Sequence, residues 1–74
     1  MHLCDLKIDD YAYIKKIDLP EFSKVRLYNL GLIEGTLVKV SLIGNGIKAY
    51  MFRNTLVAIR DCDSKNIMVG VVYG

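Results

Sequence analysis

The stretch that decides the fold of this 74-residue chain runs Arg26-Leu27-Tyr28-Asn29-Leu30-Gly31-Leu32-Ile33-Glu34-Gly35-Thr36-Leu37. Its first half is typical of a helix end, and its second half begins a strand. Gly31 directly follows Leu30, where a left-handed residue can stop a helix and costs glycine nothing. Gly35 stands at the next corner, where a type I or II turn favours glycine. The spacing therefore predicts a short buried hinge that contains Leu32 and Ile33.

Helix and strand patterns continue on both sides of this hinge. Upstream, residues 11–17 are rich in β-forming side chains and predict the first strand. The next segment, 20–30, predicts a short helix that needs the sheet to stabilise it, with Asp18 as its cap and Glu21 completing a capping box. Downstream, the sequence predicts four more strands, at 36–43, 46–52, 55–60 and 67–72.

Short turns join these last four strands. Gly44-Asn45-Gly46 predicts a type I′ hairpin, because Asn-Gly supplies both positive-φ positions. Arg53-Asn54 predicts a second tight turn, and residues 61–66 form a polar corner or a single 3₁₀ turn. Five short strands and one helix in so few residues predict a mainly β fold, a small and partly open barrel in which closure protects strand edges. The whole chain, 1–74, is expected to be one domain.

Charge and composition narrow the class of protein. Ten basic and eight acidic residues give a net charge of +2, and the two signs are interleaved along the sequence. The sequence therefore lacks the stripe of basic residues that is typical of a nucleic-acid-binding protein. The longest apolar run, 67–73, is far short of the ~20 residues of a membrane helix, which argues against membrane insertion. No cleavable leader is recognised, so we expect a cytoplasmic protein whose two cysteines are reduced.

Catalytic groups are sparse, and we expect no enzyme activity. The single histidine, His2, lies at a terminus expected to fray. Cys62 lies between Asp61 and Asp63, whose carboxylates would raise the pKa of its thiol, which does not suit a nucleophile. Neither cysteine has a basic partner evident in the sequence.

Metal ligands are also few. His2 and Cys4 lie two residues apart and could approach the second cysteine if the first segment packs beside residues 61–66. The chain lacks the paired Cys or His spacing of a dedicated site. We therefore expect no required cofactor, and at most weak binding of a ferrous or other transition-metal ion at His2 and Cys4.

The hinge belongs to a longer pattern, R-L-x-x-L-G-L-x-x-G-T-x-V, carried by Leu27, Leu30, Gly31, Leu32 and Gly35. This pattern, within a likeness over residues 19–69, resembles the FeoA family. The resemblance implies an SH3-like barrel with its helix inserted after the first strand. It also implies a cytosolic accessory protein that binds the bacterial ferrous iron transporter, a membrane protein with a nucleotide-binding domain. Such a module regulates iron uptake and lies at the inner membrane only through that partner.

Five residues are candidates for partner contact. Arg26 opens the pattern and Arg60 ends an apolar strand; each guanidinium can either pair within the fold or contact a partner. Tyr28 lies on the helix. In the strand 46–52 the family pattern turns Tyr50 and Phe52 inward, which leaves Ile47 and Met51 outside as a contact surface for the transporter or a second copy.

Two other functions fit part of the sequence. The segment 35–40 also looks like part of small RNA- or ribosome-binding barrels, although the weak net charge and the lack of interleaved basic and aromatic residues argue against it. A metal-responsive regulatory module is the second alternative, because related barrels occur in metal-dependent repressors. Against it, the chain contains no helix-turn-helix.

Overall fold

The computed structural model describes residues 1–72. All five predicted strands and the predicted helix are present, with bounds within one residue of those expected. A 3₁₀ turn at the N-terminus and a short helix before the last strand complete the fold. In chain order the elements are η1 (Leu3–Asp5), β1 (Tyr11–Ile17), α1 (Glu21–Asn29), β2 (Leu37–Ile43), β3 (Ile47–Phe52), β4 (Thr55–Arg60), α2 (Asp61–Ser64) and β5 (Ile67–Val72).

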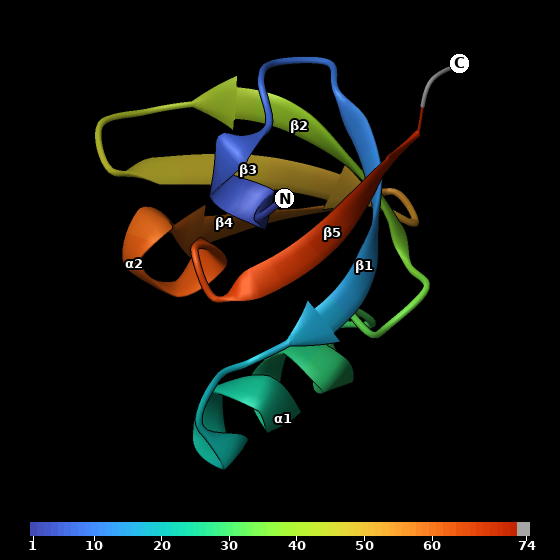
Figure 1. Cartoon of the computed structure of the whole chain (residues 1–74), viewed down its shortest axis with the longest axis vertical. Helices are drawn as coiled ribbons and strands as arrows, with labels where there is room; N and C mark the ends of the chain where they lie inside the picture. The colour runs from blue at the N-terminus through green and yellow to red at the C-terminus, as the bar shows by residue number, and fades with distance from the viewer. Residues whose placement is uncertain (73–74) are drawn as a thin grey trace.

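The strands form one curved antiparallel sheet in the order β4-β3-β2-β1-β5 (Figure 1). This is the predicted SH3-like architecture, with α1 inserted after the first strand. The sheet is not closed, because its two ends, β4 and β5, do not pair with each other. The expectation that closure protects the strand edges is therefore wrong, and each edge has to be considered separately.

The concave side of the sheet holds a single hydrophobic core. Every strand contributes to it, and Tyr50 and Phe52 of β3 point inward as expected, with 0% and 3% of their surface exposed. The other core residues are Leu3, Leu6, Ala12, Ile14, Ile17, Leu32, Val38, Val40, Ile59, Ile67 and Val69. Such burial is the main favourable contribution to folding in a domain this small.

The N-terminus is part of the fold, so the expectation that it frays is wrong. The Met1 carbonyl accepts a hydrogen bond of 2.9 Å from the Val69 N–H, and His2 forms an isolated bridge with Met68 of β5. The reason is apolar burial: Leu3 is fully buried, and the Tyr50 hydroxyl lies 3.4 Å from its carbonyl oxygen. In Figure 1, η1 lies across the concave side of the sheet.

Helix α1 differs from its prediction at its start. Pro20 occupies the cap position, no side chain caps the helix, and the predicted capping box of Asp18 and Glu21 does not form. Asp18 is too far from the first turn, and its N–H instead donates to the Asn66 carbonyl at 2.9 Å. No residue of α1 is fully buried and Phe22 is 78% exposed, but Leu27 is partly buried and packs the helix against the core, as a helix stabilised by the sheet requires.

The two hairpin turns also differ from the prediction. Between β2 and β3 only Gly46 has positive φ, 76°, and Asn45 does not, so this turn is not type I′. Between β3 and β4, Arg53 and Asn54 have φ of 49° and 61°, which is the type I′ pattern. The sequence therefore located both turns and assigned the type I′ geometry to the wrong one.

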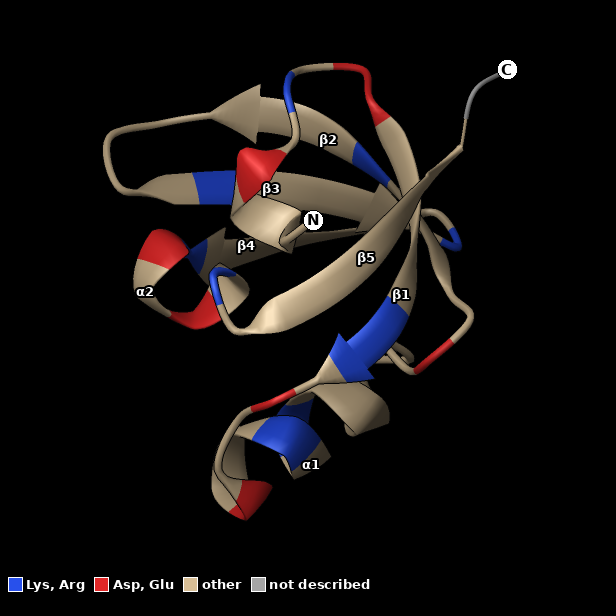
Figure 2. Ribbon diagram, viewed as in Figure 1, with Lys and Arg blue, Asp and Glu red and all other residues tan. Residues whose placement is uncertain are grey.

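Charges are distributed over the whole molecule. Figure 2 shows Lys and Arg interspersed with Asp and Glu along the ribbon, and neither colour forms a continuous stripe.

The polar corner at 61–66 contains one α-helical turn, α2, in place of a 3₁₀ turn. No helix within residues 1–72 has the length and apolar character to cross a membrane.

Candidate functional site

A groove of about 430 Å³ lies between α1 and the β3–β4 edge of the sheet. Most of the residues that line it are apolar, and its charged groups are two arginines and one aspartate. Because α1 buries no residue of its own, the helix forms one wall of the groove without filling it. The lining residues are Leu19, Phe22, Ser23, Arg26, Leu27, Leu30, Ile47, Val57, Ala58, Ile59, Arg60 and Asp63.

The C-terminal end of α1 is fixed by the first glycine of the hinge. Gly31 has φ of 95°, its N–H donates to the Tyr28 carbonyl at 3.0 Å, and the Leu32 N–H donates to the Leu27 carbonyl at 2.9 Å. These two bonds and the left-handed glycine form a Schellman motif. They stop the helix at Leu30, so that Leu27 and Leu30 remain in the groove wall.

The second half of the hinge is bonded to β1. Gly35 has φ of 90°, as the third residue of a type II turn requires, and its N–H donates to the Ile14 carbonyl at 2.7 Å. Thr36 is buried, and its hydroxyl lies 3.2 Å from the Gly31 carbonyl and 3.2 Å from the Ile33 N–H. The hinge is only partly buried: Leu32 is fully enclosed, but Ile33 is 37% exposed.

Three of the five predicted contact residues meet in the groove. Arg26 comes from α1, Ile47 from the start of β3 and Arg60 from the end of β4. Arg60 pairs with Asp63 at 3.7 Å, whereas Arg26 has no ion pair within the part of the chain that the structure describes. Arg26 is therefore an uncompensated positive charge in a mainly apolar groove.

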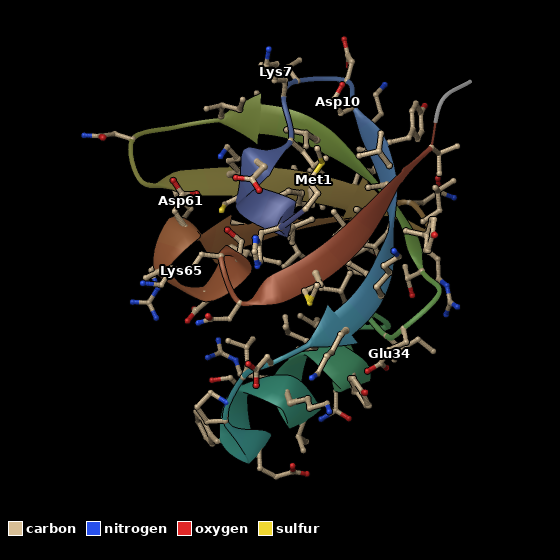
Figure 3. The ribbon with its side chains drawn as sticks, in the orientation of Figure 1. Met1, Lys7, Asp10, Glu34, Asp61 and Lys65 are labelled. Carbon is tan, nitrogen blue, oxygen red and sulfur yellow. The ribbon has the colours of Figure 1, made fainter. Side chains whose placement is uncertain are left out.

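Tyr28 and Met51, the other two candidates, lie outside the groove. The Tyr28 hydroxyl lies 2.6 and 2.8 Å from the two carboxylate oxygens of Glu34, and Figure 3 places Glu34 beside the C-terminal end of α1. This hydrogen bond lowers the pKa of Glu34 and raises that of Tyr28. Met51 is 42% exposed on the outer face of the sheet, opposite Leu56 of β4.

The groove residues that sequence reasoning missed include Leu19, Phe22 and Val57. The helix residues of the groove could have been found from their spacing: residues 22, 26 and 30 are four apart and therefore share one face of α1. The strand side gave no such signal, because the groove follows the edge of β4 and takes side chains from both faces of that strand.

The predicted metal ligands do not form a cluster. His2 Nδ1 lies 3.8 Å from Asp5 Oδ2, and Cys4 Sγ lies 3.9 Å from Asp5 Oδ1. The first segment does pack beside α2, but the Lys48 ammonium lies between them: it donates to the Cys4 carbonyl and is 3.8 Å from Asp61 Oδ1. Within residues 1–72 no group of three or more Cys, His, Asp or Glu side chains is arranged to hold a metal ion.

Comparison with known proteins assigns the chain to a family. The FeoA domain family matches residues 1–71. The solution structure of the FeoA protein from Chlorobium tepidum is 26% identical in sequence, with a TM-score of 0.92 over 100% of this chain and 72% of that one. No curated protein matches the sequence closely enough to count as a relative.

Two further structures share the fold at lower identity. A crystal structure of an iron uptake regulatory protein (FeoA) is 18% identical and has a TM-score of 0.85 over 97% of both chains. The iron(II) transport protein A from Clostridium thermocellum is 20% identical, with a TM-score of 0.88 over 97% of this chain and 46% of that one. The match over residues 1–71 and the shared fold agree with the hinge pattern, and the chain belongs to the FeoA family.

Proposed function

We propose that this chain is a non-enzymatic accessory protein of ferrous iron uptake, which acts by binding the cytosolic part of the ferrous iron transporter. The observation that carries the proposal is the groove between α1 and β4, because it exposes apolar side chains that the fold itself does not cover. Iron enters the argument through the family, whose relatives include an iron uptake regulatory protein and an iron(II) transport protein.

The chemistry of the groove favours binding over catalysis. Its polar side chains are Ser23, Arg26, Arg60 and Asp63, and no histidine or cysteine is among the lining residues. A serine without a neighbouring base is a poor nucleophile, whereas exposed aromatic and arginine side chains are typical of binding hot spots. We place Phe22, Arg26 and Ile47 at the centre of the proposed contact.

The direct test is binding of the purified chain to the transporter's isolated cytosolic domain, measured by interferometry. Phe22→Asp and Arg26→Glu should each weaken binding by at least about tenfold, as expected for central contact residues. Lys7→Glu is the matched control: Lys7 is exposed in the loop at the end of the molecule opposite α1 (Figure 3), and its reversal should change affinity little. Equal affinities for all of these proteins would place the contact elsewhere.

Tyr28 and Met51 remain proposed contact positions outside the groove. Met51→Lys should be assayed both for transporter binding and for oligomeric state by sedimentation, because its exposed face also suits a second copy. A loss of assembly with unchanged transporter binding would assign this face to self-association. The proposed location is cytoplasmic, at the inner membrane only through the transporter.

A further inference from the structure

The edge strand β4 has a row of unpaired backbone groups. In an antiparallel pair, residues alternate between positions that exchange hydrogen bonds with the partner strand and positions whose N–H and C=O face away. The Asp61 N–H donates to the Gly46 carbonyl at 2.9 Å, which fixes that alternation along β3 and β4. It follows that the N–H groups of Leu56, Ala58 and Arg60 point away from β3.

These groups have no partner within residues 1–72. None of the three N–H groups donates to another described backbone carbonyl outside the sheet. The opposite edge is different, since Met1 accepts from Val69 and His2 bridges Met68, so the N-terminal segment covers part of β5. An exposed strand edge of this kind is a template for pairing with another extended chain.

The groove follows this edge of β4. It is lined by Val57 and Ile59, whose side chains point toward the core, and by Ala58 and Arg60, which point to the outer face. Side chains from both faces of one strand can border the same groove only where it passes along the strand's edge. The wall formed by α1 stands opposite, so the groove offers a backbone edge on one side and apolar side chains on the other.

Taking the proposed function as its basis, we infer that the transporter segment in this groove binds as an extended strand added to the edge of β4, with an acidic side chain beside Arg26. Only an extended chain can satisfy the outward N–H groups of Leu56 and Ala58 in register. Its alternate side chains would pack on Phe22 and Leu30 of α1. Arg60 is already paired with Asp63, which leaves Arg26 as the cation that a carboxylate would complement.

The test separates backbone pairing from side-chain contact at one position. Ala58→Pro removes the outward N–H, and this N–H takes no part in the ladder with β3, so proline is tolerated there as on other edge strands. Ala58→Val adds a larger side chain and keeps the N–H. With the transporter's cytosolic domain as the probe, Ala58→Pro should lose at least about tenfold in affinity and Ala58→Val at most about threefold.

Hydrogen exchange provides a second measurement that needs no variant. Adding the cytosolic domain to the wild-type chain should slow exchange of the Leu56, Ala58 and Arg60 amides by roughly tenfold or more, and leave Asn45 in the β2–β3 turn unchanged. Strand addition is overturned if these three amides exchange at the same rate with and without the domain, or if Ala58→Pro and Ala58→Val bind equally well.

The remaining outcomes distinguish this inference from the function on which it rests. If Arg26→Glu loses binding while Ala58→Pro does not, the groove is the transporter site but its occupant is not a strand. If the wild-type chain does not bind the domain at all, the proposed function itself fails. Protection of the β4 amides in the isolated chain, with a dimer in sedimentation, would make the occupant a second copy and overturn the inference.

Discussion

The hydroxyl of Tyr28 lies within 2.8 Å of both carboxylate oxygens of Glu34, and so links the last turn of α1 to the corner of the hinge. Gly31 lies between these two residues in the sequence, and Gly35 directly follows Glu34. The hydrogen bond therefore closes a loop around the Schellman motif, and it holds the helix end against the turn that leads into β2. This contact supports the position of the groove wall without entering the groove.

The first prediction concerns the pH dependence of this contact. The hydrogen bond from Tyr28 lowers the pKa of Glu34, so its contribution to stability is present above the ordinary glutamate pKa of about 4.3 and is lost as pH falls through the lower folded value. Tyr28→Phe should melt slightly below wild type at neutral pH and together with it in strong acid. Melting curves from pH 7 to 3 test this: the gap should narrow as the pH falls, and a gap of constant size contradicts it. Glu34→Gln, which cannot ionise, is the control.

The second prediction concerns the positive φ of Gly31. A Cβ at this position would meet its nearest atoms at 3.7 and 3.9 Å, ordinary contact distances, so the cost of a substitution comes from the backbone. Gly31→Val should destabilise by at least about 1 kcal/mol, because a left-handed conformation costs about 1–2 kcal/mol for such a residue. Gly31→Asn should cost less, since asparagine tolerates this region. Equal melting midpoints for the two variants would contradict the assignment.

The sequence predicted those parts of the fold that depend on local patterns. β-forming residues and alternation located the strands. Gly31 located the helix stop and Gly35 the following turn, because glycine adopts a positive φ more readily than other residues. Arg26, Ile47 and Arg60 were predicted as contact residues and do lie in one groove. Whether they bind a partner remains a prediction.

The features that the sequence did not reveal depend on tertiary contacts. Leu3 and Leu6 look like any short apolar pair, and only the open concave side of the sheet explains their burial. The absence of closure is likewise a property of the sheet as a whole, so the free edge of β4 could not be found from the residues of β4 alone. The type I′ turn formed at Arg53-Asn54 because a two-residue connection, here between paired Phe52 and Thr55, favours the primed turn types.

A third prediction follows from that turn. Asn54 has φ of 61° at the second central position, which glycine prefers in a type I′ turn. Asn54→Gly should therefore stabilise the chain by about 0.5 kcal/mol. Asn45→Gly is the matched control: Asn45 does not have positive φ, so glycine there only adds freedom to the unfolded chain and should lower the melting midpoint. A midpoint raised equally by both changes would refute the turn assignment.

A fourth prediction concerns metal ions. Because no group of three or more ligands is arranged within residues 1–72, binding of ferrous or zinc ion to the reduced chain should be weak and should depend on His2 and Cys4. Calorimetry under reducing conditions measures it, with His2→Ala and Cys4→Ser as the informative variants and Cys62→Ser as the control. A tight one-to-one complex that survives His2→Ala would contradict this expectation.

The last prediction concerns Tyr50, the largest fully buried side chain within residues 1–72. Burial raises the pKa of Tyr50 to about 12; a hydrogen bond with Ser64 acts in the opposite direction, and the charges of Asp61 and Cys4 add smaller increases. The unfolded chain would lose this proton near the ordinary tyrosine value of about 10, so it binds fewer protons than the folded chain above that pH. The stabilisation by neutral Tyr50 is therefore complete below about pH 10 and is lost as pH rises through about 12.

Tyr50→Phe separates the effect of Tyr50 from that of the other ionisable groups, because all of those groups are present in both proteins. At neutral pH the variant should be less stable by about 1 kcal/mol, since the hydrogen bond to the Leu3 carbonyl is lost. Between pH 10 and 12 it should lose stability less steeply than wild type, so the two curves converge or cross. Denaturant unfolding at each pH measures this difference, and parallel curves would show that Tyr50 ionises no differently in the folded chain.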